Sequence, residues 1–147
     1  MPQIIIKRAD GGVSIGPFKG DPGVTFEKWK GVARPSELPA TYRVSDTAVV
    51  RPANRVFRNA WTDDVAGLQI DVNMDKARGL KLAFIRAERD AKLDLTDVDV
   101  LRLDGNTVSP ELRAKRQALR DIPTVVQPDL DAIETPEELE AYEPAWP

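Results

Sequence analysis

Short runs of alternating apolar and polar residues dominate the first half of the chain. The β-branched run Ile4-Ile5-Ile6 and the alternating run Val13-Ser14-Ile15 flank Asp10-Gly11-Gly12, which predicts a hairpin because glycine accepts the positive φ of a tight turn. Residues 41–44 predict a third strand, and residues 56–72 predict a second hairpin. This half of the chain therefore predicts a small antiparallel β-rich head.

The finer features of this head follow from capping and spacing. Thr25 is expected to cap a short helix that carries Phe26 and Trp29 on one side and ends before Gly31. The second hairpin is predicted from two alternating sets joined by a turn at residues 63–67: Phe57, Asn59 and Trp61, then Leu68, Ile70 and Val72.

The apolar period lengthens after Asn73, a residue that can cap a helix. One apolar stripe at spacings of three and four follows: Met74, Ala77, Leu80, Phe84, Ala87 and Ala91. The pattern continues to Leu103 and is expected to end at residues 104–106. Ser109-Pro110 starts a second helix, with serine as the cap and proline at the first helical position, and we expect Pro123 to end it. The prediction is an amphipathic helical hairpin over residues 73–121, after a head over residues 1–72.

Residues 122–147 form an acidic arm in the sequence. They hold seven Asp and Glu and no Lys or Arg, in a chain whose net charge is −3. Thr135-Pro136-Glu137-Glu138 is a capping box that predicts a short helix ended by Pro144. The expected fold class is therefore α+β: a small antiparallel β head, an amphipathic helical hairpin and an extended acidic C-terminal arm.

Composition excludes most catalytic designs. The chain has no cysteine and no histidine, which removes disulfides, zinc–thiolate sites, thiol nucleophiles and the commonest general base. The aspartates after residue 93 do not form an EF-hand loop, because counting from Asp97 places Leu101 and Arg102 where an oxygen ligand and a glycine are needed. Asp63 and Asp64 are read as turn formers. We therefore expect no enzymatic activity, no catalytic residue, no metal ligand and no cofactor.

Membranes and nucleic acids are not expected partners either. No run of 18 apolar residues occurs, the first residues lack the pattern of a signal peptide, and no basic stripe is interleaved with aromatics.

A second protein chain is the partner that the sequence favours. The amphipathic helices need the head or another chain to cover them, so we expect a homo-oligomer or a hetero-complex. Trp146 lies near the end of the acidic arm, where it either frays into solvent or anchors in a partner pocket. We expect Leu139, Tyr142 and Trp146 to dock on a neighbouring chain, although an arm that serves only solubility has the same composition.

Four pieces of the sequence, in order, resemble a group of small tailed-bacteriophage proteins that are encoded near tail-fibre genes and often labelled tail-fibre assembly proteins. The pieces are Ile4-Ile5-Ile6-Lys7-Arg8-Ala9-Asp10-Gly11-Gly12-Val13-Ser14, Phe57-Arg58-Asn59-Ala60-Trp61, Val72-Asn73-Met74-Asp75-Lys76-Ala77-Arg78, and Gln117-Ala118-Leu119-Arg120-Asp121-Ile122-Pro123 followed by Thr135-Pro136-Glu137-Glu138-Leu139. The chain departs from the group at residues 93–103, where aspartates interrupt what is elsewhere a longer helix.

The resemblance implies a role in a phage tail and carries no catalytic residues. Two roles stay open: a structural component of the virion tail that connects or attaches fibre or baseplate proteins, or a tail-fibre assembly chaperone that is absent from the mature virion. The expected location is the virion tail, after assembly in the host cytoplasm.

Overall fold

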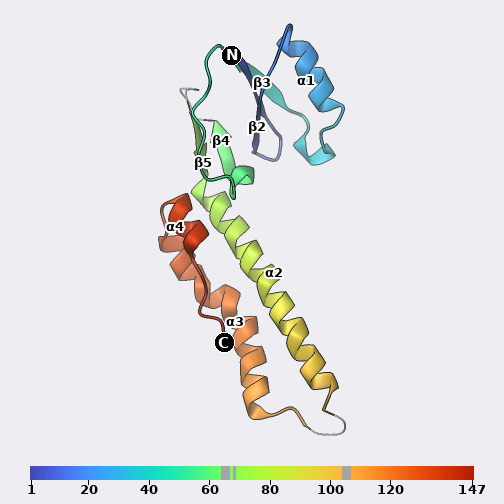
Figure 1. Cartoon of the computed structure of the whole chain (residues 1–147), viewed down its shortest axis with the longest axis vertical. Helices are drawn as coiled ribbons and strands as arrows, with labels where there is room; N and C mark the ends of the chain where they lie inside the picture. The colour runs from blue at the N-terminus through green and yellow to red at the C-terminus, as the bar shows by residue number, and fades with distance from the viewer. Residues whose placement is uncertain (64–66, 68, 104–106) are drawn as a thin grey trace. The chain divides into compact units, whose positions relative to one another are not determined.

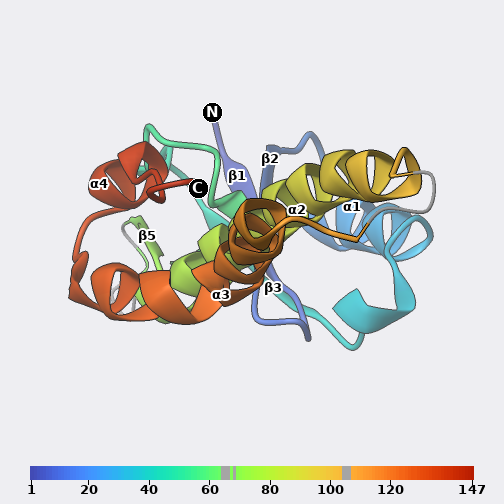
Figure 2. The same ribbon diagram turned by 90° about the horizontal axis from the view of Figure 1, so that it is seen from below.

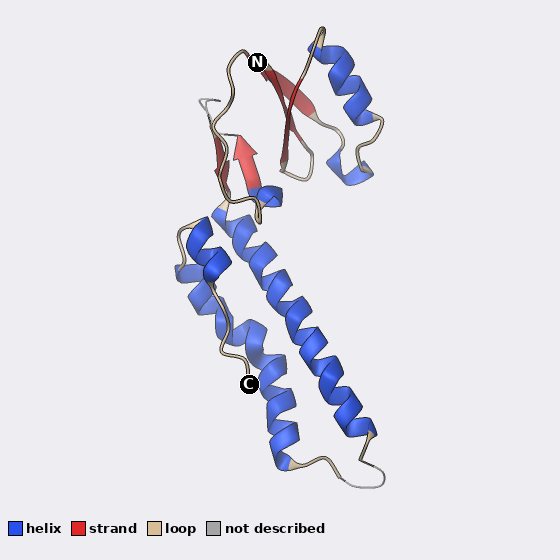
Figure 3. Cartoon of the chain, in the orientation of Figure 1, coloured by secondary structure: helices blue, strands red, loops and turns tan. Residues whose placement is uncertain are grey.

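The computed structural model describes residues 1–63, 67, 69–103 and 107–147, and these form two compact units, Met1–Ala77 and Arg78–Pro147 (Figure 1). The strands all lie in the first unit, and long helices make up the second (Figure 3). The fold class is α+β, as the sequence predicted.

A three-stranded antiparallel sheet forms the centre of the first unit. Its strands are β1 (Gln3–Lys7), β2 (Val13–Pro17) and β3 (Thr41–Ser45), in the order β2-β1-β3. Ile5 pairs with Ile15 on one side and with Arg43 on the other. The hairpin turn contains Gly11 with a φ of 81°, a left-handed conformation that glycine adopts without strain. The predicted hairpin and third strand are confirmed.

The helix α1 (Pro22–Lys30) lies on one face of this sheet. The ring of Phe26 is 4.7 Å from that of Tyr42, which pairs with the buried Ile6. The helix is capped by Asp21, whose carboxylate accepts a hydrogen bond of 2.8 Å from the Gly23 amide, so the predicted Thr25 cap was wrong. Aspartate followed directly by proline at the first helical position is the stronger start signal, and it places Thr25 inside the first turn. A short 3₁₀ turn, η1 (Pro35–Glu37), follows α1.

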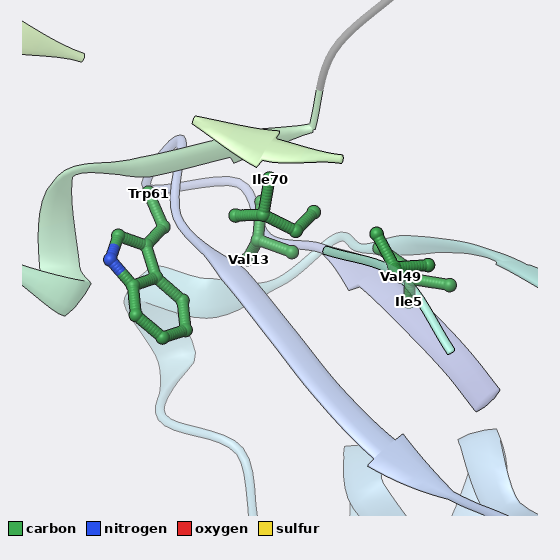
Figure 4. Packing of buried hydrophobic residues seen from close by; sticks show 5 residues of the cluster. All are labelled: Ile5, Val13, Val49, Trp61 and Ile70. Atoms are coloured by element: carbon green, nitrogen blue, oxygen red, sulfur yellow. The ribbon is translucent and has the colours of Figure 1, made fainter. Parts of the chain in front are cut away.

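A two-stranded ribbon covers the other face. It consists of β4 (Trp61–Asp63) and β5 (Ile70–Val72), which pair antiparallel. Residues just before it form a 3₁₀ turn, η2 (Arg58–Ala60), so the expectation that Phe57 and Asn59 belong to the first arm of a hairpin was wrong. The predicted turn at residues 63–67 falls partly outside the described residues, and Leu68 falls wholly outside them. The side chains between ribbon and sheet form one core cluster, drawn in Figure 4: Ile5, Val13, Val49, Trp61 and Ile70.

The second unit is built on an antiparallel pair of helices, α2 (Met74–Leu101) and α3 (Pro110–Ala132), which lie side by side in Figures 1 and 2. The predicted caps are confirmed: Asn73 accepts a hydrogen bond from the Lys76 amide at 3.1 Å, and Ser109 accepts one from the Leu112 amide at 3.1 Å. Contacts at both ends fix the antiparallel pairing, since Arg116 bonds to Thr96 and Arg78 bonds to the carbonyl oxygen of Leu130. The predicted terminator of α2 at residues 104–106 lies outside the described residues.

The end of α3 differs from the prediction. The helix does not stop at Pro123; it continues through Pro123 and Pro128 to Ala132. Its buried residues keep helical spacing across both prolines: Leu119, Ile122, Val126 and Leu130. Burial of this row outweighs the hydrogen bonds that the prolines cannot donate. Much of the sequence expected to form an extended arm is therefore helical, since the short helix α4 (Pro136–Ala141) follows, capped by Thr135 as predicted.

The buried face of α2 also differs from the prediction. Ile85 and Thr96 are each only 3% exposed, whereas Phe84 of the predicted stripe is 49% exposed and Ala91 is exposed. The helix carries apolar residues on two faces, and α3 covers the face that contains Ile85 and Thr96. The first half of the predicted stripe is buried or half-buried, with Ala77 fully buried, whereas its second half, Phe84, Ala87 and Ala91, is exposed.

Candidate interaction surfaces

The candidate interaction surfaces of the described residues are formed by apolar and charged side chains. Among the described residues, no three Asp or Glu side chains gather closely enough to bind a metal ion. Within the same ranges, no helix is long and apolar enough to cross a membrane.

The three residues predicted to dock on a partner lie against the second unit of their own chain. Leu139 of α4 is fully buried. Tyr142 is half-buried and donates a hydrogen bond of 2.9 Å from its hydroxyl to the carboxylate of Asp129 on α3. Trp146 is half-buried, and the ammonium nitrogen of Lys92 on α2 lies 4.9 Å from its ring centre, which allows a cation–π interaction.

These contacts change what the C-terminal residues can offer to a partner. Lys81 adds a hydrogen bond of 3.0 Å to the carbonyl oxygen of Glu140, so both helices of the hairpin hold the segment after α3. Leu139 has no surface left for another chain while α4 keeps this position. Docking of the three residues on a neighbouring chain stays a prediction, and the intramolecular contacts favour a role in stabilising the second unit.

The phenol of Tyr142 provides a test of this packing. Burial, together with the hydrogen bond and the negative charge of Asp129, raises the pKa of Tyr142 from 10.0 to about 12. Because this pKa is raised on folding, the associated stability is complete below pH 10 and is lost as the pH rises from 10 to about 12. We expect an absorbance titration of phenolate formation to show a step near pH 12 that Tyr142→Phe removes. If Tyr142→Phe instead removes a step near pH 10, the phenol of Tyr142 is not packed against Asp129, which would contradict the structure.

The exposed stripe of α2 is the clearest apolar surface in the second unit. Its large members are Phe84, Leu95, Val98 and Leu101, whose exposed fractions are 49%, 70%, 45% and 84%. Ala87 and Ala91 lie between them and are also exposed. We call these six residues the α2 row. The apolar spacing of α2 already contained this row, but sequence reasoning assigned its first members to the buried side.

An ion pair joins the sheet of the first unit to the ribbon. The carboxylate of Asp63 is 2% exposed and accepts two hydrogen bonds from Arg43, at 2.6 Å from Nε and 2.7 Å from Nη2. Lys7 adds a longer contact of 3.7 Å. The hydrogen bonds from Arg43 lower the pKa of Asp63 below its ordinary 3.8, and burial opposes them. Asp63 therefore has a structural role beyond the turn that was expected of it, whereas Asp64 lies outside the described residues.

Removing this carboxylate is expected to weaken the first unit. Asp63→Asn replaces the anionic acceptor of the partly buried Arg43 guanidinium by a neutral amide and leaves the 2.7 Å hydrogen bond to the Gly67 carbonyl oxygen in place, so we expect the free energy of unfolding to fall by about 1.5 kcal/mol at neutral pH. The difference should vanish in acid, because a lowered pKa confers stability above pH 3.8 that is lost as the pH falls through the folded value. Urea unfolding of the variant and the wild type, at neutral pH and in acid, measures this difference in the free energy of unfolding. Asp71→Asn on the exposed side of β5 is the matched control, and an equal effect there would contradict the assignment.

Comparison of the chain with known protein families, with curated proteins and with solved structures gives no match.

Proposed function

We propose that this protein is a structural component of a bacteriophage tail, a connector or attachment protein at the fibre or baseplate that acts through protein–protein contacts. The resemblance of four sequence pieces to small tail-fibre-associated proteins supports the assignment to a tail. The α2 row supports action by contact, because soluble proteins seldom leave large apolar side chains in one continuous line. It is the single observation that carries this part of the proposal.

The occupant that best fits the α2 row is a second copy of the same helix in antiparallel orientation. From Met74 to Lys92 the helix has six basic and three acidic residues, whereas from Leu93 to Leu101 it has three acidic and no basic ones. An antiparallel pair sets the basic half of each helix against the acidic half of the other, and a parallel pair sets like charges together. Such a pair is two-fold symmetric, so the row contacts itself, with Phe84 of one copy near Leu101 of the other.

A charge placed in the α2 row tests this pairing. We expect the wild type to sediment as a dimer and Leu95→Glu to sediment as a monomer with unchanged helical circular dichroism, because burying a carboxylate in the apolar seam is unfavourable. Val125→Glu is the matched control, since Val125 is 63% exposed on α3. A wild type that stays monomeric at high concentration, or equal effects of the two variants, would refute the dimer.

The tail assignment needs a separate experiment on phage particles. Mass spectrometry of purified virions should detect the chain in a fixed ratio to the fibre or baseplate proteins. Its absence from particles whose assembly requires it would reject the structural role and favour the assembly chaperone. Leu95→Glu should reduce incorporation while Val125→Glu does not, which connects the row to the function.

A further inference from the structure

The first unit contains a hollow of about 240 Å³ with an unusual concentration of guanidinium groups. Four of its lining residues are arginines: Arg8 directly after β1, Arg51 and Arg55 in the segment after β3, and Arg58 at the start of η2. Val13 and Ile15 of β2 and Trp61 of β4 supply its apolar part.

Most of this positive charge has no counterpart in the structure. Arg8 has ion pairs of 3.1 Å with Asp10 and 3.4 Å with Glu37. Arg51, Arg55 and Arg58 are exposed, and their guanidinium groups form no hydrogen bond or ion pair with any residue in the described ranges. Three guanidinium groups at the rim of one hollow repel one another, and each presents a planar fork of donors that matches a carboxylate.

A buried donor without an acceptor lies at the same hollow. Trp61 is 6% exposed, and its Nε1 is buried with no hydrogen-bond acceptor in the part of the chain that the structure describes. Figure 4 shows the nitrogen-bearing edge of the ring turned away from Ile70 and Val13 of the core cluster. Leaving such a donor unpaired is unfavourable, and an acceptor oxygen in the hollow would satisfy it.

We propose that this hollow binds a glutamate or aspartate side chain from an acidic segment of a partner protein. The carboxylate accepts hydrogen bonds from the arginine forks at the rim and from Nε1 of Trp61. Its aliphatic stem packs on the apolar wall formed by Val13 and Ile15. The inference is independent of the tail assignment, because it rests only on residues of the first unit.

The same residues favour a protein over a nucleic acid. Single-stranded nucleic acids stack their bases on exposed aromatic faces, and Trp61 is too deeply buried to offer one. Duplex binding uses a broad basic surface, whereas residues 1–77 hold eleven basic and nine acidic side chains. Three unpaired guanidinium groups gather at one small hollow, which suits a single carboxylate.

A titration of the full chain with a blocked penta-glutamate peptide tests the proposal. The three tryptophans give three indole N–H signals in an NMR spectrum, and Trp61→Phe identifies the one from Trp61. We expect the peptide to shift the Trp61 signal downfield and to leave those of Trp29 and Trp146 unchanged. Arg55→Gln and Arg58→Gln should each weaken peptide binding about tenfold without altering the fold, since both side chains are exposed.

The matched controls each remove one positive charge elsewhere in the first unit. Lys19→Gln and Lys28→Gln each change an exposed residue outside the hollow and should leave affinity nearly unaltered. An equal loss of peptide affinity in a control variant would show that binding depends only on net charge, which would overturn the proposal. So would an unmoved Trp61 signal, equally tight binding of penta-glutamine or inorganic phosphate, or tighter binding of a single-stranded oligonucleotide.

Discussion

Leu139→Ala is expected to lower the free energy of unfolding of the second unit by about 3 kcal/mol. The side chain is fully buried although it lies on a helix of only six residues near the end of the chain. Truncation removes the main apolar contact of α4 and leaves a cavity that so short a helix cannot close by itself. Urea unfolding followed by helical circular dichroism measures the loss, because the long helices α2 and α3 report on the second unit.

Val125→Ala is the control for this experiment. It also truncates an apolar side chain of the same unit to alanine, but Val125 is 63% exposed on α3 and lies outside the α2 row, so the change should stay within about 0.5 kcal/mol. Equal effects of the two substitutions would show that α4 is not packed on the hairpin in solution.

The buried position of Leu139 also decides how C-terminal truncations are read. Deleting residues 135–147 would test docking on a neighbouring chain only if the rest of the second unit stayed folded. In this fold the deletion also removes Leu139 from the core of the second unit and takes Tyr142 from its partner Asp129. Loss of incorporation would therefore follow from destabilisation alone, and point variants in the α2 row separate contact from folding more cleanly.

Local signals predicted the parts of the fold that local physics controls. The Asp10-Gly11-Gly12 turn, the Asn73 cap and the Ser109-Pro110 helix start each depend on a few neighbouring residues, and all are present. Such local signals did not predict which face of α2 is buried. Periodicity identifies an amphipathic helix, but α2 has one apolar row through Phe84 and another through Ile85, and only the packing of α3 selects between them.

The candidate sites also depend on tertiary packing that local sequence does not indicate. Trp146 was expected to need a partner because it lies near the chain end, yet Lys92, distant in sequence, lies over its ring. Arg51, Arg55 and Arg58 recur at spacings of four and three, but no sequence pattern indicates that β1, β2 and β4 bring Arg8, Val13 and Trp61 to the same hollow. Such placements depend on sheet register, which the sequence alone does not determine here.

Because α3 continues through two prolines, replacing one of them by alanine is expected to stabilise the second unit. Pro128 lies in the interior of the helix and is exposed, so it donates no hydrogen bond to the carbonyl oxygen of Thr124 and buries little surface in return. Proline is about 3 kcal/mol less favourable than alanine inside a helix, and part of that difference is offset because alanine leaves the unfolded chain more freedom. Pro128→Ala should therefore raise the free energy of unfolding of the second unit by about 2 kcal/mol.

Pro110→Ala provides the comparison, because Pro110 is the first residue of the same helix. Its amide would have no partner within the helix, and its fixed φ suits the helix start, so this substitution should be neutral or slightly destabilising. Urea unfolding of both variants and the wild type measures the difference. A gain for Pro128→Ala only is expected if the buried row from Leu119 to Leu130 holds α3 helical against its prolines. No gain, or equal shifts for both variants, would mean that the segment after Pro123 is not a continuous helix in solution.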